Sequence, residues 1–156
     1  NDSPGGTVTI DGTPTQGQKL TANTSTITDA DELGTFSYQW KRGGSAITDA
    51  IYDEYTLVQA DVGNDISVSV SYLDGGGTTE TLTSASKNIN NVNDAPTFTS
   101  TPVTSAIEDL PYLYTVTTQD VDAGDSVTLT GTTIPSWLTF TASIGNLSGT
   151  ASNDVV

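Results

Sequence analysis

The chain has 156 residues and a formal net charge of −15, from 19 Asp and Glu against 4 Lys and Arg. This excess of carboxylates argues against nucleic acid and anionic membranes as partners, because phosphate groups are bound by clusters of cationic side chains. Cysteine and histidine are absent, which excludes disulfides, thiolate metal sites and the Ser–His or Cys–His nucleophiles of many hydrolases. An apolar content of 34%, with abundant Thr, Ser and Gly, predicts thin all-β domains.

One short motif occurs twice. Asn1-Asp2-Ser3-Pro4 opens the chain, and Asn93-Asp94-Ala95-Pro96 follows 92 positions later (93 − 1). A period of this length suits one β-sandwich, so we expect two tandem domains, residues 1–92 and residues 93–156. Proline keeps the preceding residue extended, which favours a stiff linker at each motif. Because the chain begins within a linker motif, we expect it to be a segment of a longer protein.

Strands of the first domain are predicted where apolar and polar residues alternate. Residues 66–72 show this pattern most clearly, and the other expected strands cover residues 7–10, 19–22, 36–41, 55–57 and 78–89. Turns are expected at Asp11-Gly12, at residues 60–63 and in a hairpin at residues 74–77. Residues 29–34 form an acidic loop between the second and third strands.

Several strings of the first domain resemble the immunoglobulin-like repeats of very large secreted bacterial adhesins. They are Thr7-Val8-Thr9-Ile10-Asp11-Gly12, Gln18-Lys19-Leu20-Thr21-Ala22, Tyr38-Gln39-Trp40-Lys41-Arg42, Tyr55-Thr56-Leu57 and Ala60-Asp61-Val62-Gly63. The resemblance implies that Trp40 is buried between two sheets, as in other immunoglobulin-type sandwiches. It also implies that apolar residues, Leu20 or Ala22 with Val68, replace the paired cysteines of antibody domains.

The second domain has expected strands at residues 96–99, 112–116, 127–130, 135–140 and 146–150, with an acidic loop at residues 119–125. The strings Ser136-Trp137-Leu138-Thr139-Phe140 and Leu147-Ser148-Gly149-Thr150 resemble cadherin-like domains of the dystroglycan type, which occur in the same bacterial surface proteins. In that family two more strands follow a segment similar to residues 152–156. We therefore expect a cadherin-like sandwich that lacks its last strands and exposes unpaired edges. Either truncation or a strand supplied by another chain would account for it.

Both acidic loops contain an Asp-x-Asp sequence, which can aim two carboxylates at one centre. Such carboxylates repel each other unless a cation lies between them. Calcium takes six to eight oxygen ligands, more than one loop supplies, so we expect Ca²⁺ where a linker meets loops. The expected ligands are Asp2, Asp29 and Asp31 at the outer end of the first domain, Asn93, Asp94, Asp120 and Asp122 at the internal joint with Asp61 approaching it, and, as further candidates, Asp74, Glu108 and Asp109.

Simpler roles compete with calcium binding. Acidic surfaces are commonly just solvated, and Asp61 and Asp74 could each stabilise a turn through a bond to the backbone. Trp40 and Trp137 could stack on sugar rings, although each lies in an apolar strand pattern typical of a core residue.

The sequence therefore predicts a non-enzymatic segment of an extracellular bacterial adhesin, an array of β-sandwiches stiffened by calcium between domains. The alternative is an adhesion module that binds glycans or a protein. Its expected surface is the unpaired edge of the second domain, where strand donation or a dimer contact could occur.

Overall fold

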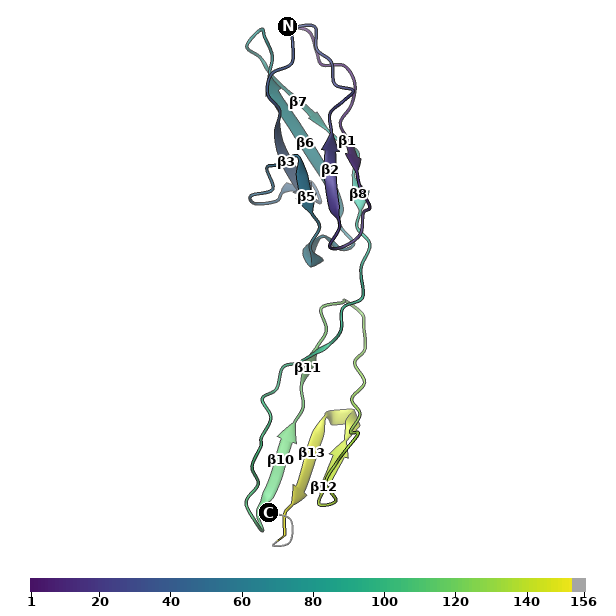
Figure 1. Cartoon of the computed structure of the whole chain (residues 1–156), viewed down its shortest axis with the longest axis vertical. Coiled ribbons are helices and arrows are strands. Elements are labelled where there is room, and N and C mark those ends of the chain that lie inside the picture. Colours follow the sequence, from purple (N-terminus) through teal and green to yellow (C-terminus); the bar gives the residue numbers. More distant parts are fainter. Residues whose placement is uncertain (153–156) are drawn as a thin grey trace. The chain divides into compact units, whose positions relative to one another are not determined.

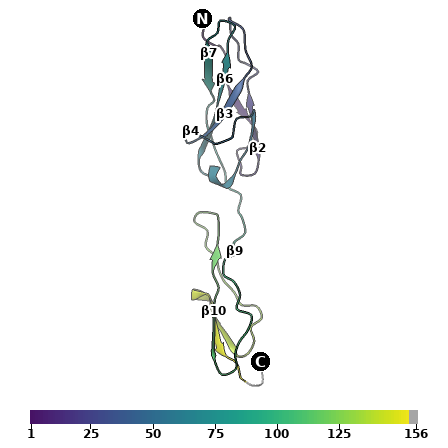
Figure 2. The same ribbon diagram turned by 90° about the vertical axis from the view of Figure 1, so that its left-hand side faces the viewer.

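The computed structural model describes residues 1–152. Its regular elements are antiparallel β-strands and two short 3₁₀ turns, η1 (Gln59–Asp61) and η2 (Ala142–Ile144). The chain divides into two compact units, Asn1–Val92 and Asn93–Val156, and both are visible in Figures 1 and 2. The predicted all-β class is confirmed. Within the described part of the chain, no helix has the length and apolar character needed to span a membrane.

Unit 1 consists of two facing β-sheets. One contains β1 (Thr9–Asp11), β2 (Lys19–Asn23) and β5 (Glu54–Thr56), in the order β1-β2-β5. The other has the order β4-β3-β6-β7 and contains β3 (Ser37–Arg42), β4 (Ser45–Ala46), β6 (Asp65–Leu73) and β7 (Thr79–Thr83), with β8 (Lys87–Asn88) also paired to β6 (Figure 1).

The core of unit 1 follows the period-2 alternation of its strands. Ile66, Val68, Val70 and Tyr72 of β6 all point inward and are buried, because successive side chains of a strand point to opposite faces. Trp40 pairs with Val68 in the register of β3 and β6 and is fully buried. Its indole nitrogen donates to the carbonyl of residue 52 at 2.9 Å. The core role of Trp40 is thus confirmed.

The single strand expected at residues 78–89 is divided into β7 and β8. Ser84 interrupts it: its backbone amide donates to the Val68 carbonyl at 2.9 Å, and its hydroxyl accepts the Val68 amide at 3.0 Å. A side chain therefore replaces one backbone carbonyl of the ladder, and the regular pairing of Lys87–Asn88 resumes three residues later. The sequence pattern does not reveal that a serine hydroxyl takes the place of a backbone carbonyl here.

Unit 2 contains two small sheets. The larger has the order β10-β13-β12, from β10 (Pro111–Thr115), β12 (Leu138–Thr141) and β13 (Asn146–Thr150). The smaller pairs β9 (Thr97–Phe98) with β11 (Thr118–Gln119), and β9 is labelled in Figure 2. The expected strand at residues 127–130 is not formed, because no strand of residues 1–152 pairs with its backbone.

The two units differ in how much apolar surface they bury. Thirteen buried residues form the core cluster of unit 1, whereas Ala151 is the one buried apolar residue among those described in unit 2. The inward residues of β10, β12 and β13 are only half-buried. Within the described residues, the inward face of the larger sheet of unit 2 is therefore only partly covered.

Trp40→Ala tests the core of unit 1. We expect it to lower the free energy of unfolding of this unit by about 3–5 kcal/mol, the usual cost of removing a large buried aromatic side chain. Chemical denaturation followed by circular dichroism measures the loss. Tyr52→Ala removes an exposed ring from the same region and should change stability by less than about 0.5 kcal/mol. Equal losses in the two variants would contradict the assignment.

Candidate functional site

Each unit contains the same acidic loop closed by the same hydrogen bond. In unit 1 the Asp31 amide donates to Asp29 Oδ1 at 3.0 Å, and in unit 2 the Asp122 amide donates to Asp120 Oδ1 at 3.0 Å. A carboxylate that accepts the amide two residues later forms an Asx turn. The first aspartate of each Asp-x-Asp sequence thus shapes its own loop.

The second aspartate of each loop binds the motif that opens its unit. The Asp2 amide donates to Asp31 Oδ2 at 2.7 Å, and the Asp94 amide donates to Asp122 Oδ2 at 2.6 Å. Hydrogen bonds to an ionised carboxylate are shorter and stronger than neutral ones. The Asn-Asp-x-Pro motif and the Asp-x-Asp loop, which the sequence suggested separately, are therefore one recurring structure in which a carboxylate holds a linker amide.

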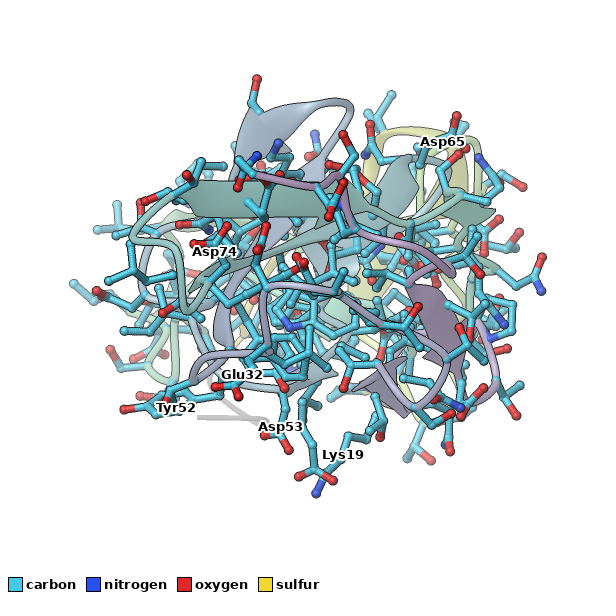
Figure 3. All side chains as sticks on the ribbon, turned by 90° about the horizontal axis from the view of Figure 1, so that it is seen from above. Lys19, Glu32, Tyr52, Asp53, Asp65 and Asp74 are labelled. Atoms are coloured by element: carbon cyan, nitrogen blue, oxygen red, sulfur yellow. The ribbon has the colours of Figure 1, made fainter. Side chains whose placement is uncertain are left out.

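In unit 1 a hairpin brings a third carboxylate to this loop. The Gly75 amide of the β6–β7 hairpin donates to the Asp31 carbonyl at 2.6 Å, and a Cβ on Gly75 would lie 2.5 Å from that oxygen, so only glycine permits the approach. The neighbouring Asp74 is 4% exposed, and its Oδ1 accepts the Thr78 amide at 2.7 Å. Its Oδ2 is buried and has no hydrogen-bond partner. Figure 3 labels Asp74 well inside the outline of the side chains, whereas Tyr52 lies at the rim.

The carboxylates of Asp31 and Asp74 border a common space. A Cβ built on Gly76 would lie 3.3 Å from Asp74 Oδ1 and 4.0 Å from Asp31 Cγ. Asp29, in the same loop, is held by the Tyr72 hydroxyl, which donates to its Oδ2 at 2.6 Å. This bond is the main reason that the pKa of Asp29 is lowered. Burial, followed by the same bond, raises the pKa of Tyr72.

In unit 2 the third carboxylate belongs to the same loop. Oxygens of Asp120, Asp122 and Asp125 lie within 4.8 Å of one another, and no other described acids of the chain form such a group. Asp122 is 5% exposed. Gly124, with φ of +98°, turns the chain so that Asp125 faces back toward the loop, where its amide donates to the Asp122 carbonyl at 3.3 Å. Sequence reasoning missed Asp125, although the glycine before it was a signal for this turn.

The carboxylate of Asp61 is bonded within the fold, which argues against calcium binding there. It is fully buried, and both carboxylate oxygens are occupied: Arg42 Nε donates to Oδ1 at 2.7 Å, while the Tyr55 hydroxyl and the Val58 amide donate to Oδ2 at 2.9 and 2.8 Å. The bond to Asp61 raises the pKa of Arg42. The bond to Val58 stabilises the start of η1, so the turn interpretation of Asp61 accounts for its position.

Three other candidates have contacts of a different kind. The Asn93 side chain donates to the carbonyl of the following residue at 3.2 Å. Glu108 and Asp109 are exposed in a turn, and Asp109 adopts a left-handed φ of +57°. Its backbone amide donates to the Ala151 carbonyl at 3.0 Å. Neither acid belongs to a described group of three carboxylates.

The two tryptophans differ in environment. Trp40 stacks on Tyr55 inside the core, with ring centroids 5.7 Å apart. Trp137 is half-buried and packs edge-on against Tyr112, also with centroids 5.7 Å apart. Trp40 is therefore unable to stack on a sugar without unfolding of unit 1.

Comparison of the chain with known protein families gives a match in its second half. Residues 95–156 match the He_PIG family, whose description reads "Putative Ig domain". This match covers unit 2 and supports an immunoglobulin-like domain there. No curated protein matches the chain.

Tyr72→Phe tests the hydrogen bond to Asp29. Because that bond lowers the folded-state pKa of Asp29, we expect the substitution to raise it toward the ordinary value of 3.8. The stability contributed by the lowered pKa is present above the unfolded value and is lost as the pH falls through the folded one. The variant should therefore lose less stability on acidification than the parent chain. Carboxyl NMR titration measures the pKa, with Tyr38→Phe as the control, and an unchanged Asp29 titration would rule the bond out.

Arg42→Ala tests the buried ion pair. It removes the cation that faces Asp61, and a buried carboxylate without its partner typically costs about 3–5 kcal/mol. Lys41→Ala, one residue away on β3, removes a cation for which no ion pair is found among the described residues and should cost less than about 1 kcal/mol. Urea denaturation of both variants gives the difference. A loss no larger for Arg42→Ala than for Lys41→Ala would contradict the structural role of Asp61.

Proposed function

We propose that this chain is a structural segment of a secreted bacterial adhesin, in which calcium stiffens an array of immunoglobulin-like and cadherin-like domains. The all-β fold and the immunoglobulin-like family match of residues 95–156 support the structural part of this proposal. Immunoglobulin-like domains are typically non-enzymatic, and their function resides in sites carried on the fold. We propose no catalytic role for the chain.

The observation that carries the calcium proposal is the unpartnered oxygen of Asp74. Leaving a buried carboxylate oxygen without a partner is costly, so its presence beside Asp31 favours a ligand that the oxygen can bind. A hard divalent cation that prefers oxygen ligands fits this environment. We propose that Asp31 and Asp74 are the core of a site in unit 1, with Asp2 and Asp29 at its edge.

A second site is proposed at Asp120, Asp122 and Asp125. Two carboxylates about 4 Å apart repel each other by roughly 4 kcal/mol at an effective dielectric constant of 20, and three gathered within 4.8 Å add further repulsion. A divalent cation removes this cost. The absence of Lys and Arg from residues 93–156 means that no side chain of unit 2 can substitute for it. Affinities on the order of 10⁻⁴ to 10⁻³ M, usual for extracellular modules, are expected.

Calcium would act on the linker through the second aspartate of each loop. Asp31 and Asp122 each hold the amide of a linker aspartate. When a cation fixes the carboxylate, the linker bonded to it is fixed as well, and the chain on either side has fewer conformations. This is the proposed origin of stiffness, and it suits an extracellular location because calcium there reaches the millimolar range of such sites.

Calcium titration by calorimetry tests the two sites. We expect millimolar or tighter binding that Asp74→Asn weakens at the first site and Asp120→Asn at the second, each by at least tenfold. Asp53→Asn, an exposed acid beside Lys19 (Figure 3), is the matched control and should leave both affinities unchanged. Absence of calcium heat in the parent chain at millimolar concentration would refute the proposal.

Stiffening needs a separate measurement because binding alone does not establish it. Small-angle X-ray scattering of the parent chain should differ between calcium and a chelator, and the difference should vanish in the Asp120→Asn variant. If the scattering profiles superimpose while calorimetry still detects binding, calcium stabilises its loop only locally. The proposed stiffening of the array would then be wrong.

A protein-binding module is the second candidate function. The uncovered apolar face of unit 2 favours it.

A further inference from the structure

We propose that the cation site of unit 1 selects Ca²⁺ over Mg²⁺, and that Tyr72 and the backbone of Gly75 set this selectivity by fixing the loop and the hairpin around the site. The inference rests on the proposed calcium site at Asp31 and Asp74 and adds the ion that this site rejects. It depends on a buried oxygen, on a frame of short hydrogen bonds around it, and on the contrast with the carboxylates of unit 2.

The oxygen that an ion has to reach in unit 1 is enclosed by protein. Asp74 is 4% exposed, and its Oδ2 is buried without a hydrogen-bond partner in the described part of the chain. An ion that binds this oxygen must first lose the water on that side. Ca²⁺ exchanges water for six to eight oxygen ligands in flexible geometry, whereas Mg²⁺ dehydrates reluctantly and usually keeps several waters. The burial of Asp74 therefore favours Ca²⁺.

Hydrogen bonds fasten the end of β6 to the acidic loop on both sides of Asp74. Before it, the Tyr72 hydroxyl donates to Asp29 Oδ2 at 2.6 Å, and after it, the Gly75 amide donates to the Asp31 carbonyl at 2.6 Å. Asp29 Oδ1 in turn accepts the Asp31 amide at 3.0 Å. Both aspartates of the Asp-x-Asp sequence are thus tied to the strand and hairpin that carry Asp74, which fixes the spacing between loop and hairpin.

The two anchors of this frame are themselves held in place. Tyr72 is 3% exposed and packs edge-on against Phe36, with ring centroids 5.5 Å apart. At Gly75 a Cβ would lie 2.5 Å from the Asp31 carbonyl oxygen, so a side chain there would push the hairpin away from the loop. A frame fixed in this way resists contraction to the metal–oxygen distances of Mg²⁺, about 2.0–2.1 Å against about 2.3–2.6 Å for Ca²⁺.

The carboxylates of unit 2 make a different demand on the ion. Asp120, Asp122 and Asp125 come from a single loop, in which Asp120 is half-buried and Asp125 is exposed. An ion reaches exposed oxygens without losing all of its water, so Mg²⁺ with part of its water shell can bind there as well as Ca²⁺. The two proposed sites of one chain should therefore differ in selectivity.

Calorimetric titration of the full chain with Ca²⁺ and with Mg²⁺ tests the selectivity in two variants that each keep one site. Asp120→Asn keeps the site of unit 1, and Asp74→Asn keeps that of unit 2. We expect the Asp120→Asn chain to bind Ca²⁺ at least tenfold more tightly than Mg²⁺, and the ratio of the two affinities to be at least fivefold smaller in the Asp74→Asn chain.

The outcomes of this titration separate the selectivity from the site itself. Equal binding of the two ions by the Asp120→Asn chain would overturn the selectivity and leave the calcium site standing. An affinity ratio as large in the Asp74→Asn chain would show that burial and the frame of unit 1 are not its cause. Absence of calcium binding to the Asp120→Asn chain would remove the site of unit 1 and this inference with it.

Tyr72→Phe tests the frame. Combined with Asp120→Asn, it removes one anchor of the loop and keeps the buried ring. We expect the preference for Ca²⁺ over Mg²⁺ to fall at least threefold, because the loosened loop can approach the smaller ion. Tyr38→Phe in the same background is the matched control and should leave the ratio unchanged. If Tyr72→Phe lowers both affinities by the same factor, or changes neither, Tyr72 serves the fold alone and does not set the selectivity.

Gly76→Ala, also combined with Asp120→Asn, locates the ion. Its methyl group would lie 3.3 Å from Asp74 Oδ1 and 4.0 Å from Asp31 Cγ, in the space that both carboxylates border. We expect the calcium affinity to fall at least tenfold, while circular dichroism shows that unit 1 remains folded. Calcium binding as tight as with glycine at this position would place the ion elsewhere and would overturn the argument from burial.

Discussion

A single kind of contact organises both units: an ionised carboxylate that accepts the backbone amide of the linker in front of it. Asp31 holds the amide of Asp2, and Asp122 holds that of Asp94. Each acceptor is itself positioned by an Asx turn to the aspartate two residues earlier. Because an amide proton and a cation can use different oxygens of one carboxylate, this arrangement links the path of the chain to the charge state of the loop. The proposed calcium sites follow from that link.

The two units differ in how they bury the apolar side chains of a small β domain. In unit 1 the two sheets cover each other, and the half-buried side chains of Arg42 and Tyr55, both bonded to the fully buried carboxylate of Asp61, connect them. In unit 2, as far as residue 152, the inward side chains of the larger sheet are only half-buried. Among the described residues, unit 1 thus has a closed apolar core and unit 2 an apolar groove.

The sequence was most informative where local pattern and burial coincide. The alternation of β6 and the position of Trp40 predicted the core of unit 1. The prediction holds because β6 and β3 pair with each other, so that their apolar residues share one buried face. The same reasoning failed at residues 127–130, where a β-like sequence has no neighbour, since a strand depends on pairing as well as on its own residues. The sequence groups Asp61 with the calcium candidates, because its bond to Arg42, 19 positions away, has no local signature. Asp125 was missed because its approach depends on the backbone angle of Gly124.

The four cationic side chains, Lys19, Lys41, Arg42 and Lys87, all lie in unit 1. Proteases of the trypsin type recognise a basic side chain through a carboxylate in their specificity pocket. From residue 88 to residue 156 the chain presents no such side chain, so its open sheet offers these enzymes nothing to cut. An incompletely covered domain would ordinarily be an easy target for digestion, and here the composition removes that vulnerability for a whole class of extracellular enzymes.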